Sequence, residues 1–224
     1  MKNIKNSVLL IIVGILVSSS SLLAGGKGFQ GIIIYNISYA DDLDPQMATM
    51  MPKTLKLMIK GNKSRTEMIT GFGTTTVLFD GDDMSSVVLM DMMGQKFAMK
   101  MSHEEMEKEN EDVPETMVEV TDETKEIAGY VCKKALVKSV DETDDFEEFV
   151  YFSDELGSGI LNSNNPLFKD IDGVMLEYAN SDNDVNMKME AISVEKKKIS
   201  DKKFEIPEGY KIVTQEELQN MFGG

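Results

Sequence analysis

Few residues in this sequence could perform acid–base or nucleophilic chemistry. His103 is the only histidine and Cys132 the only cysteine among 224 residues. Nucleophilic catalysis needs a base beside the nucleophile, and nothing in the spacing of these two residues indicates such a pair. His103 stands in the acidic run Ser102-His-Glu-Glu105, where we expect a solvated side chain. Cys132 has no partner cysteine, so we predict that its thiol is buried and unpaired. Because no nucleophile–base pair is indicated, we predict no catalytic residue and no enzyme activity.

The acidic residues offer no specific metal site. Runs such as Glu104-Glu105 and Glu147-Glu148 are typical of solvated faces. Asp182-Asn183-Asp184 lacks the alternating ligands, glycine and distal glutamate of an EF-hand calcium loop. No Cys/His cluster has zinc spacing, and no glycine-rich phosphate loop follows a predicted strand. We therefore predict no metal site and no cofactor.

Methionine is the unusual component of the sequence, with 18 Met and no Trp. Met99/Met101 and Met187/Met189 are spaced two residues apart, which places each pair on one face of a strand. Three interpretations stay open: core filling, a flexible lining for an apolar ligand or partner, and a thioether copper(I) site. The strand spacing favours core or lining, because Met-rich copper sites usually add histidine.

A period-two alternation of apolar and polar residues predicts half-buried antiparallel strands to position these side chains. The clearest alternating sets are Ile33, Tyr35, Ile37 and Tyr39; Leu55, Leu57 and Ile59; and Phe97, Met99 and Met101. Further strand-like runs are 74–79, 84–90, 116–120, 131–138, 147–152, 174–178 and 187–194. Tight-turn signals at Gly61-Asn62, Asp80-Gly81 and Met93-Gly94 predict that neighbouring strands pair as hairpins.

The apolar set from Met187 to Ala191 switches parity to Ile192 and Val194, which predicts a β-bulge near residues 190–192. Bulges bend sheets, and so many strands with few helices must close into a barrel or curl around something apolar. We therefore predict a mainly β (α+β) fold, in which a curved antiparallel meander forms an unclosed half-barrel with a few short helices.

Short helices are predicted by capping signals. Ser102-His-Glu-Glu105 and Thr214-Gln-Glu-Glu217 are capping boxes followed by apolar residues. Asn165-Pro166 has an Asn in the cap position and a Pro in the first helical position, so it predicts a third short turn.

The N-terminus has the order of a secretory signal peptide. Lys2 and Lys5 precede an apolar run from Val8 to Val17, and small residues lead to Ala24. The run is shorter than the roughly 20 residues that span a bilayer. We predict a signal peptide at 1–24, a periplasmic location, and a single β-rich domain at 25–224 without an integral membrane segment. The net charge of −16 argues against nucleic acid as a partner.

The sequence resembles an envelope-protein family, domain of unknown function 4412, in the segments Met50-Met-Pro52, Ile59-Lys-Gly61, Thr124-Lys-Glu-Ile-Ala-Gly-Tyr-Val-Cys-Lys-Lys-Ala135 and Ile206-Pro-Glu-Gly-Tyr210. The resemblance spans most of residues 28–222. A similar Ala-Gly-Tyr turn followed by Cys occurs in the related GLPGLI group. The resemblance implies a fold like that of the LolA/LolB lipoprotein carriers, an unclosed β-barrel with a concave apolar face. It implies no catalytic residue, and the carrier function is an analogy of fold.

These features lead us to expect a non-catalytic periplasmic binding protein whose concave face takes a lipid, an acyl chain or a lipidated protein segment. The predicted lining residues are Tyr35, Leu57, Met99, Met101, Phe149, Met187 and Met189. One alternative is an interaction module that lacks a ligand cavity and contacts another envelope protein. A Met-based copper binder is the other.

Overall fold

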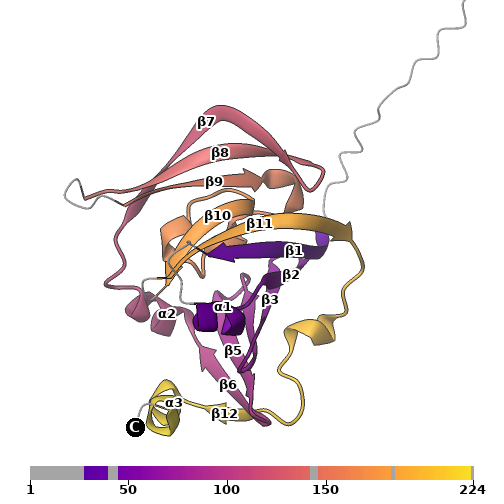
Figure 1. Ribbon diagram of the computed structural model, residues 1–224, viewed down its shortest axis with the longest axis vertical. Coiled ribbons are helices and arrows are strands. Elements are labelled where there is room, and N and C mark those ends of the chain that lie inside the picture. Colours follow the sequence, from indigo (N-terminus) through magenta and orange to yellow (C-terminus); the bar gives the residue numbers. More distant parts are fainter. Residues whose placement is uncertain (1–27, 40–44, 142–145, 183–184, 223–224) are drawn as a thin grey trace, which may run out of the picture.

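Strands dominate the computed structural model, which describes residues 28–39, 45–141, 146–182 and 185–222 (Figure 1). The strands are β1 (Gln30–Tyr39), β2 (Thr54–Lys60), β3 (Lys63–Thr70), β4 (Gly73–Asp80), β5 (Ser85–Met92), β6 (Gln95–Met101), β7 (Thr116–Ile127), β8 (Tyr130–Ser139), β9 (Glu147–Ser153), β10 (Val174–Asp182), β11 (Val185–Lys196) and β12 (Lys211–Val213). The helices are α1 (Pro45–Met50), α2 (His103–Glu109) and α3 (Gln215–Phe222), and the 3-10 helices are η1 (Asp154–Leu156), η2 (Gly159–Asn162), η3 (Pro166–Phe168) and η4 (Asp201–Phe204).

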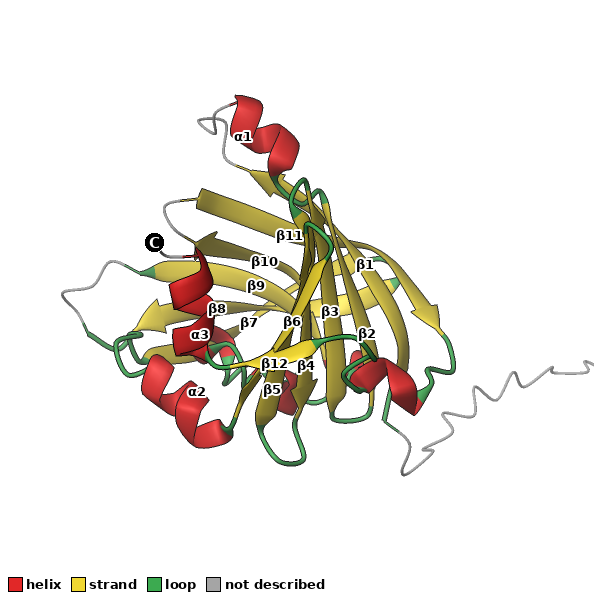
Figure 2. Cartoon of the chain, turned by 90° about the horizontal axis from the view of Figure 1, so that it is seen from below, coloured by secondary structure: helices red, strands yellow, loops and turns green. Residues whose placement is uncertain are grey.

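All these strands belong to one curved 12-stranded sheet with the order β12-β6-β5-β4-β3-β2-β1-β11-β10-β9-β8-β7. The edge strands β12 and β7 do not pair with each other, so the sheet stays open. Figure 2 shows the strong curvature of the sheet, with α2 and α3 on one side of it. The predicted mainly β, unclosed half-barrel with few short helices is confirmed.

The sheet is more than a single meander. Two hairpin series, β2–β6 and β7–β11, flank the central strand β1, which pairs antiparallel with both β2 and β11. β1 suits the centre because Ile33 and Tyr35 are buried on one face while Ile32 and Ile34 are half-buried on the other. β12 pairs parallel with β6, which the sequence pattern did not predict because this strand has only three residues.

The predicted bulge in β11 is confirmed. Ile34 pairs with Ser193 and Tyr35 with Ala191, so Ile192 is the extra residue on β11. A similar register shift on β10 leaves Leu176 without a partner on β9. Because each bulge increases local twist, these shifts bend the sheet where β1 meets β11 and again within the β7–β11 series.

Different segments of the chain pack on the two faces of the sheet. We call the face that bears Tyr35 and Leu57 the inner face and the opposite face the outer face. The connection between β9 and β10, residues 154–173, packs its buried residues Leu156 and Phe168 into the inner-face core. On the outer face, residues 197–210 cross β3 to β6, and the Arg65 guanidinium donates to the Lys203 carbonyl at 3.0 Å.

The two predicted capping boxes are confirmed. Ser102 and Glu105 exchange the hydrogen bonds of a capping box at the start of α2. Thr214 and Glu217 do the same at α3, where the Glu217 carboxylate accepts from the Thr214 backbone at 2.9 Å. Pro166 begins η3 after Asn165, although the Asn side chain makes no capping hydrogen bond.

The predicted signal peptide at 1–24 lies outside the described residues, as does the cleavage site after Ala24. Within the described ranges, no helix combines the length and apolar character needed to cross a bilayer.

Candidate functional site

The inner face holds a cavity of about 360 Å³ between β1, β2, β3, β10 and the η2–η3 connection. We call it the central cavity. Its lining residues are Tyr35, Leu57, Ser64, Thr66, Leu161, Asn162, Asn164, Asn165, Pro166, Val174, Met175 and Tyr178. This volume falls within the range of about 300–1,000 Å³ that is usual for small-molecule sites.

Two tyrosines, Tyr35 and Tyr178, contact each other in the lining of the central cavity. The Tyr35 hydroxyl donates to the Met175 carbonyl at 2.9 Å, and its ring meets the Tyr178 ring edge-on with centroids 6.3 Å apart. Burial raises the pKa of Tyr178 to about 12 and raises the pKa of Tyr35 well above its usual value. Both phenols therefore stay neutral at physiological pH.

None of the residues that line the central cavity is charged, although charged residues make up 28% of the chain. Its polar groups are hydroxyls and amides, which can donate or accept hydrogen bonds without carrying charge. The Asn162 amide is committed to the fold, because it donates to the Ile171 carbonyl at 2.8 Å and the Gly173 carbonyl at 2.9 Å. The site therefore suits an uncharged ligand that combines apolar groups with hydrogen-bonding groups.

Sequence reasoning named Tyr35 and Leu57 but missed the polar part of this lining. Ser64 and Thr66 belong to β3, whose residues Lys63–Thr70 show almost no apolar alternation. Asn164 and Asn165 belong to an irregular connection. A cluster of Asn beside the predicted turn at Asn165-Pro166 was the available signal, but it also fits an ordinary surface loop.

Met99 and Met101 lie at the far side of the inner face. They line a second cavity of about 600 Å³ between β6, β12, α2 and α3, whose lining also includes the apolar Ile212 and Val213. Unlike the central cavity, this one has charged residues in its wall, among them Glu105. The structure therefore places these methionines in a different cavity from Tyr35 and Leu57.

A row of half-buried side chains joins the two cavities across the sheet. Leu57 pairs with Thr66, Thr66 with Val77, Val77 with Val88 and Val88 with Met99. Because residues paired in this way point to the same face, the row forms a continuous, mainly apolar strip on the inner face. A long apolar chain could extend along this strip from either cavity.

The other predicted lining residues have separate environments. Met189 is buried in the core cluster around Tyr35, and Met187 packs against that cluster. Phe149 is 43% exposed, with its ring edge-on to Tyr151 at 6.0 Å and the Lys134 ammonium 5.2 Å from its centroid. The structure thus brings Tyr35, Leu57, Met187 and Met189 together, and it does not place Phe149 with them.

The candidate catalytic residues stand in contrasting surroundings. His103 is exposed on α2, with its Nε2 atom 3.5 Å from the Glu107 carboxylate. Cys132 is a free, fully buried thiol, which confirms the prediction, and burial raises its pKa to about 11. Within the described part of the chain, no three His, Cys, Asp or Glu side chains gather into a possible metal site.

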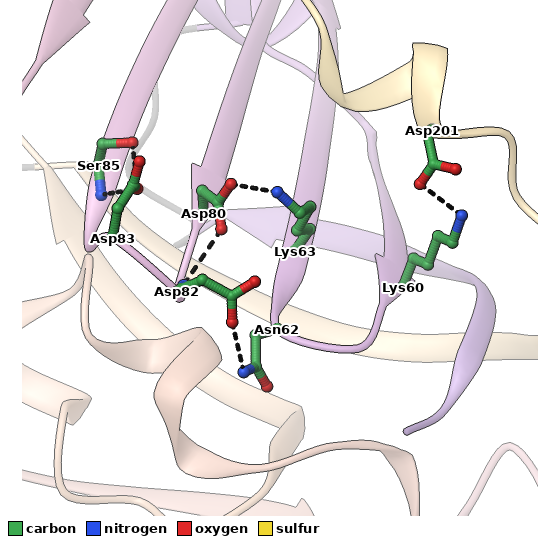
Figure 3. Close-up of polar contacts among 8 residues, drawn as sticks. All are labelled: Lys60, Asn62, Lys63, Asp80, Asp82, Asp83, Ser85 and Asp201. Carbon is green, nitrogen blue, oxygen red and sulfur yellow. Dashed lines mark hydrogen bonds and ion pairs between the residues drawn. The ribbon is translucent and has the colours of Figure 1, made fainter. Parts of the chain in front are cut away.

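The turns at one end of β2 to β5 form a charged cluster, drawn in Figure 3. We call it the charged end. Lys60 pairs with Asp201, and Lys63 pairs with Asp80. Two turn carboxylates complete the cluster: Asp82 accepts from the Asn62 amide at 2.9 Å, and Asp83 accepts from the Ser85 hydroxyl at 2.6 Å. The carboxylates are thus matched by donors within the chain.

Two solved structures are similar to this chain at low sequence identity. Mycobacterium tuberculosis lipoprotein LppX is 8% identical, with a TM-score of 0.39 over 77% of this chain and 90% of LppX. LprF from Mycobacterium bovis is 8% identical, with a TM-score of 0.33 over 82% of this chain and 91% of LprF. A comparison with curated protein sequences finds no match.

The family comparison covers most of the chain. The model of the family described as domain of unknown function DUF4412 matches residues 45–210, which include β2 to β11 and every residue of the central cavity except Tyr35. The match also includes in full all four segments on which the resemblance was based. The chain therefore belongs to the DUF4412 family.

Proposed function

We propose that this protein is a non-catalytic binding protein of the cell envelope that holds an apolar ligand in the central cavity. The ligand class is a lipid or acyl chain with an uncharged polar group, or a protein segment that carries such a chain. Residues 1–24 would direct export to the periplasm, and residues 25–224 would act as a single domain.

The observation that carries this proposal is a charge-free cavity in a strongly charged chain. Tyr35, Leu57 and Tyr178 supply apolar walls, while Ser64 and Thr66 supply neutral hydrogen-bonding groups. Burying about eight methylenes at about 0.8 kcal/mol each would contribute about 6 kcal/mol before ordering costs. That is enough for measurable binding without an ionic anchor.

The lining also supports a non-catalytic role. A serine hydroxyl becomes a nucleophile when a base accepts its proton, and no residue of the lining is a His, Asp, Glu or Lys. The pKa values of Tyr35 and Tyr178 are raised by burial, so neither phenol supplies a base near neutral pH. The cavity therefore has groups that bind and none that activates Ser64.

Competitive binding of a fluorescent acyl probe to the delipidated protein tests the proposal. Thr66→Trp places an indole in the cavity and should weaken probe affinity by about tenfold or more. The matched control, Thr124→Trp on the exposed part of β7, should bind as the wild type does. A neutral monoacylglycerol should displace the probe better than a fatty acid anion of equal length, because the lining offers no cation.

A second candidate function is an interaction module whose inner face is filled by its own connection. Leu156 and Ile171 of residues 154–173 are fully buried there, and Phe168 is nearly so. If the delipidated wild-type protein shows no saturable probe binding, the binding-protein proposal fails. The packed connection would then make the interaction module the better account.

A further inference from the structure

The two ends of the β2–β5 hairpins differ sharply in chemistry. The charged end carries Lys60, Lys63, Asp80 and Asp82 around its turns (Figure 3). At the opposite end, the connections are α1 with the residues after it, the β3–β4 turn and the β5–β6 turn. Residues 49–52, 69–73 and 92–95 at this end include no charged side chain, in a chain with 28% charged residues.

Large apolar side chains are exposed at this uncharged end. The exposed fractions are 43% for Met50, 69% for Ile69, 56% for Phe72 and 90% for Met93. We call these residues the apolar rim. Single exposed apolar side chains are ordinary, but a group of them on neighbouring turns marks an interaction surface.

Backbone contacts show that the rim is continuous. The Gly71 amide donates to the Met50 carbonyl at 2.9 Å, which joins the end of α1 to the β3–β4 turn. Gly73 pairs with Met92, which joins that turn to the start of the β5–β6 turn. The two turns are two strand spacings apart, or about 10 Å. Figure 2 shows α1 at one extremity of the molecule, beside turns of the sheet.

The rim leads directly onto the inner face. Met68, next to Ile69, pairs with Leu55 and Thr75, and Met90 pairs with Thr75 and Phe97. Met68 and Met90 are half-buried, so apolar surface continues from the turns toward the strip that joins the cavities. An apolar molecule moving between the rim and the cavities would stay in contact with apolar side chains.

We infer that the apolar rim inserts into the interfacial region of a lipid bilayer, with the charged end directed toward water. This surface would let the protein exchange an apolar ligand with a membrane, and in that respect the inference rests on the proposed function. Phe, Ile and Met side chains on turn tips suit shallow insertion below the headgroups. Among the described residues, Lys53 and the Asp91–Lys96 ion pair, at 3.4 Å, lie next to these uncharged segments and would remain at headgroup level.

The net charge of the protein determines whether neutral or anionic bilayers favour insertion of the apolar rim. A net charge of −16 opposes approach to an anionic surface, so insertion must depend on apolar contact. We therefore expect binding to neutral phosphatidylcholine vesicles that changes little between low and high salt. Adding anionic lipid should weaken this binding at low salt, where repulsion is least screened.

A single-tryptophan reporter tests insertion directly, because the natural chain contains no Trp. Phe72→Trp in the full chain should show a blue-shifted emission with phosphatidylcholine vesicles, and brominated acyl chains should quench it. Phe149→Trp, an exposed aromatic position on β9, is the matched control and should show neither effect. Equal quenching at both positions would overturn the inference, as would no change at position 72.

A pair of double variants tests the contribution of the rim to affinity. Phe72→Glu with Met93→Glu should lower vesicle affinity by about tenfold or more. Val131→Glu with Ile192→Glu adds the same charge at positions that are each 60% exposed elsewhere, and it should leave affinity within about twofold. Any contribution from residues 1–24 is the same in the wild type and in both double variants, so it cancels in the comparison.

Two further outcomes separate this inference from its alternatives. A blue shift of Phe72→Trp that rises with protein concentration without vesicles would assign the rim to a second copy of the chain and overturn membrane insertion. If the acyl probe binds the central cavity but position 72 stays in water, the inference fails while the proposed function stands. If position 72 inserts but no probe binds, the inference stands and the proposed function fails.

Discussion

Glu177 is a carboxylate whose burial requires explanation. Its side chain is 4% exposed on the outer face of β10, and it pairs with Lys125 of β7 and, at 2.7 Å, with Lys188 of β11. Burial opposes ionisation of Glu177, but the hydrogen bonds from both lysines outweigh it and hold the pKa below its usual value. The charge is therefore retained because two cations from separate strands compensate for lost solvation.

Replacing Glu177 by Gln should lower the free energy of unfolding at pH 7 by about 1–3 kcal/mol. Because the folded-state pKa is depressed, the stabilisation is complete above about pH 4.5 and is lost as the pH falls through the folded value. The difference between wild type and Glu177→Gln should therefore shrink between pH 7 and pH 3. Urea denaturation at several pH values measures it.

The matched control for this prediction is Glu147→Gln. Glu147 pairs with Lys138 at 3.3 Å, but its side chain is 59% exposed, so its removal should cost well under about 1 kcal/mol at any pH. Equal losses for both variants, or a difference that does not depend on pH, would contradict the account of Glu177.

At the scale of elements, the β7–β8 hairpin shows how one short motif sets a local structure. Ile127 pairs with Tyr130 across a two-residue turn, in which Ala128 has a φ of +50° and Gly129 a φ of +85°. Two positive φ values match the twist of the flanking strands. The Ile127–Tyr130 motif thus sets the backbone conformation of the turn, and Cys132 lies buried just beyond it.

Gly129→Ala should lower the free energy of unfolding by about 1–2 kcal/mol. A Cβ at this position would meet nothing within 4 Å, so the loss is conformational and not steric. Gly129→Asn should lose less, because Asn tolerates the left-handed region better than Ala does. Thermal denaturation compares the variants, and a larger loss for Asn would show that side-chain size matters instead.

Sequence patterns predicted the elements that carry strong alternation or caps and missed those that carry neither. β1 and β6 were visible because their apolar residues alternate, and α2 because Ser102 and Glu105 form a capping box. β3 was missed because its inner side chains, such as Ser64 and Thr66, line a cavity and its outer face carries Arg65 and Glu67. The 3-10 helices of residues 154–168 were missed, except at Asn165-Pro166, because turns of three or four residues have no detectable period.

For the molecule as a whole, the inner face was predictable but its division into sites was not. Alternation correctly placed Tyr35, Leu57, Met99 and Met101 on one face of the sheet, since their registers connect across it. Two separate cavities arise because residues 154–173 and the α2–α3 pair cover different parts of that face. Such long-range packing leaves no local signal in the sequence.

The processed protein should begin at Gly25, because Ala24 is the small residue that ends the predicted signal peptide. Intact-mass measurement of the protein recovered from the periplasmic fraction tests this expectation. Ala24→Leu should block processing, since a large residue replaces the small one at the cut, and should yield the full-length mass. Recovery of wild-type protein mainly as the full-length chain in the membrane fraction would refute both the processing and the periplasmic location.

The central position of β1 also determines the order in which this protein can fold. β1 pairs with β2, its neighbour in sequence, and with β11, where Gly31 meets Lys196 near the other end of the chain. Hairpins such as β3–β4 can form within microseconds, but the pairing of β1 with β11 requires a loop closure across most of the chain and is therefore slower. An N-terminal fragment that stops before β11 therefore leaves β1 with an open edge, and only a nearly complete chain can reach the native topology.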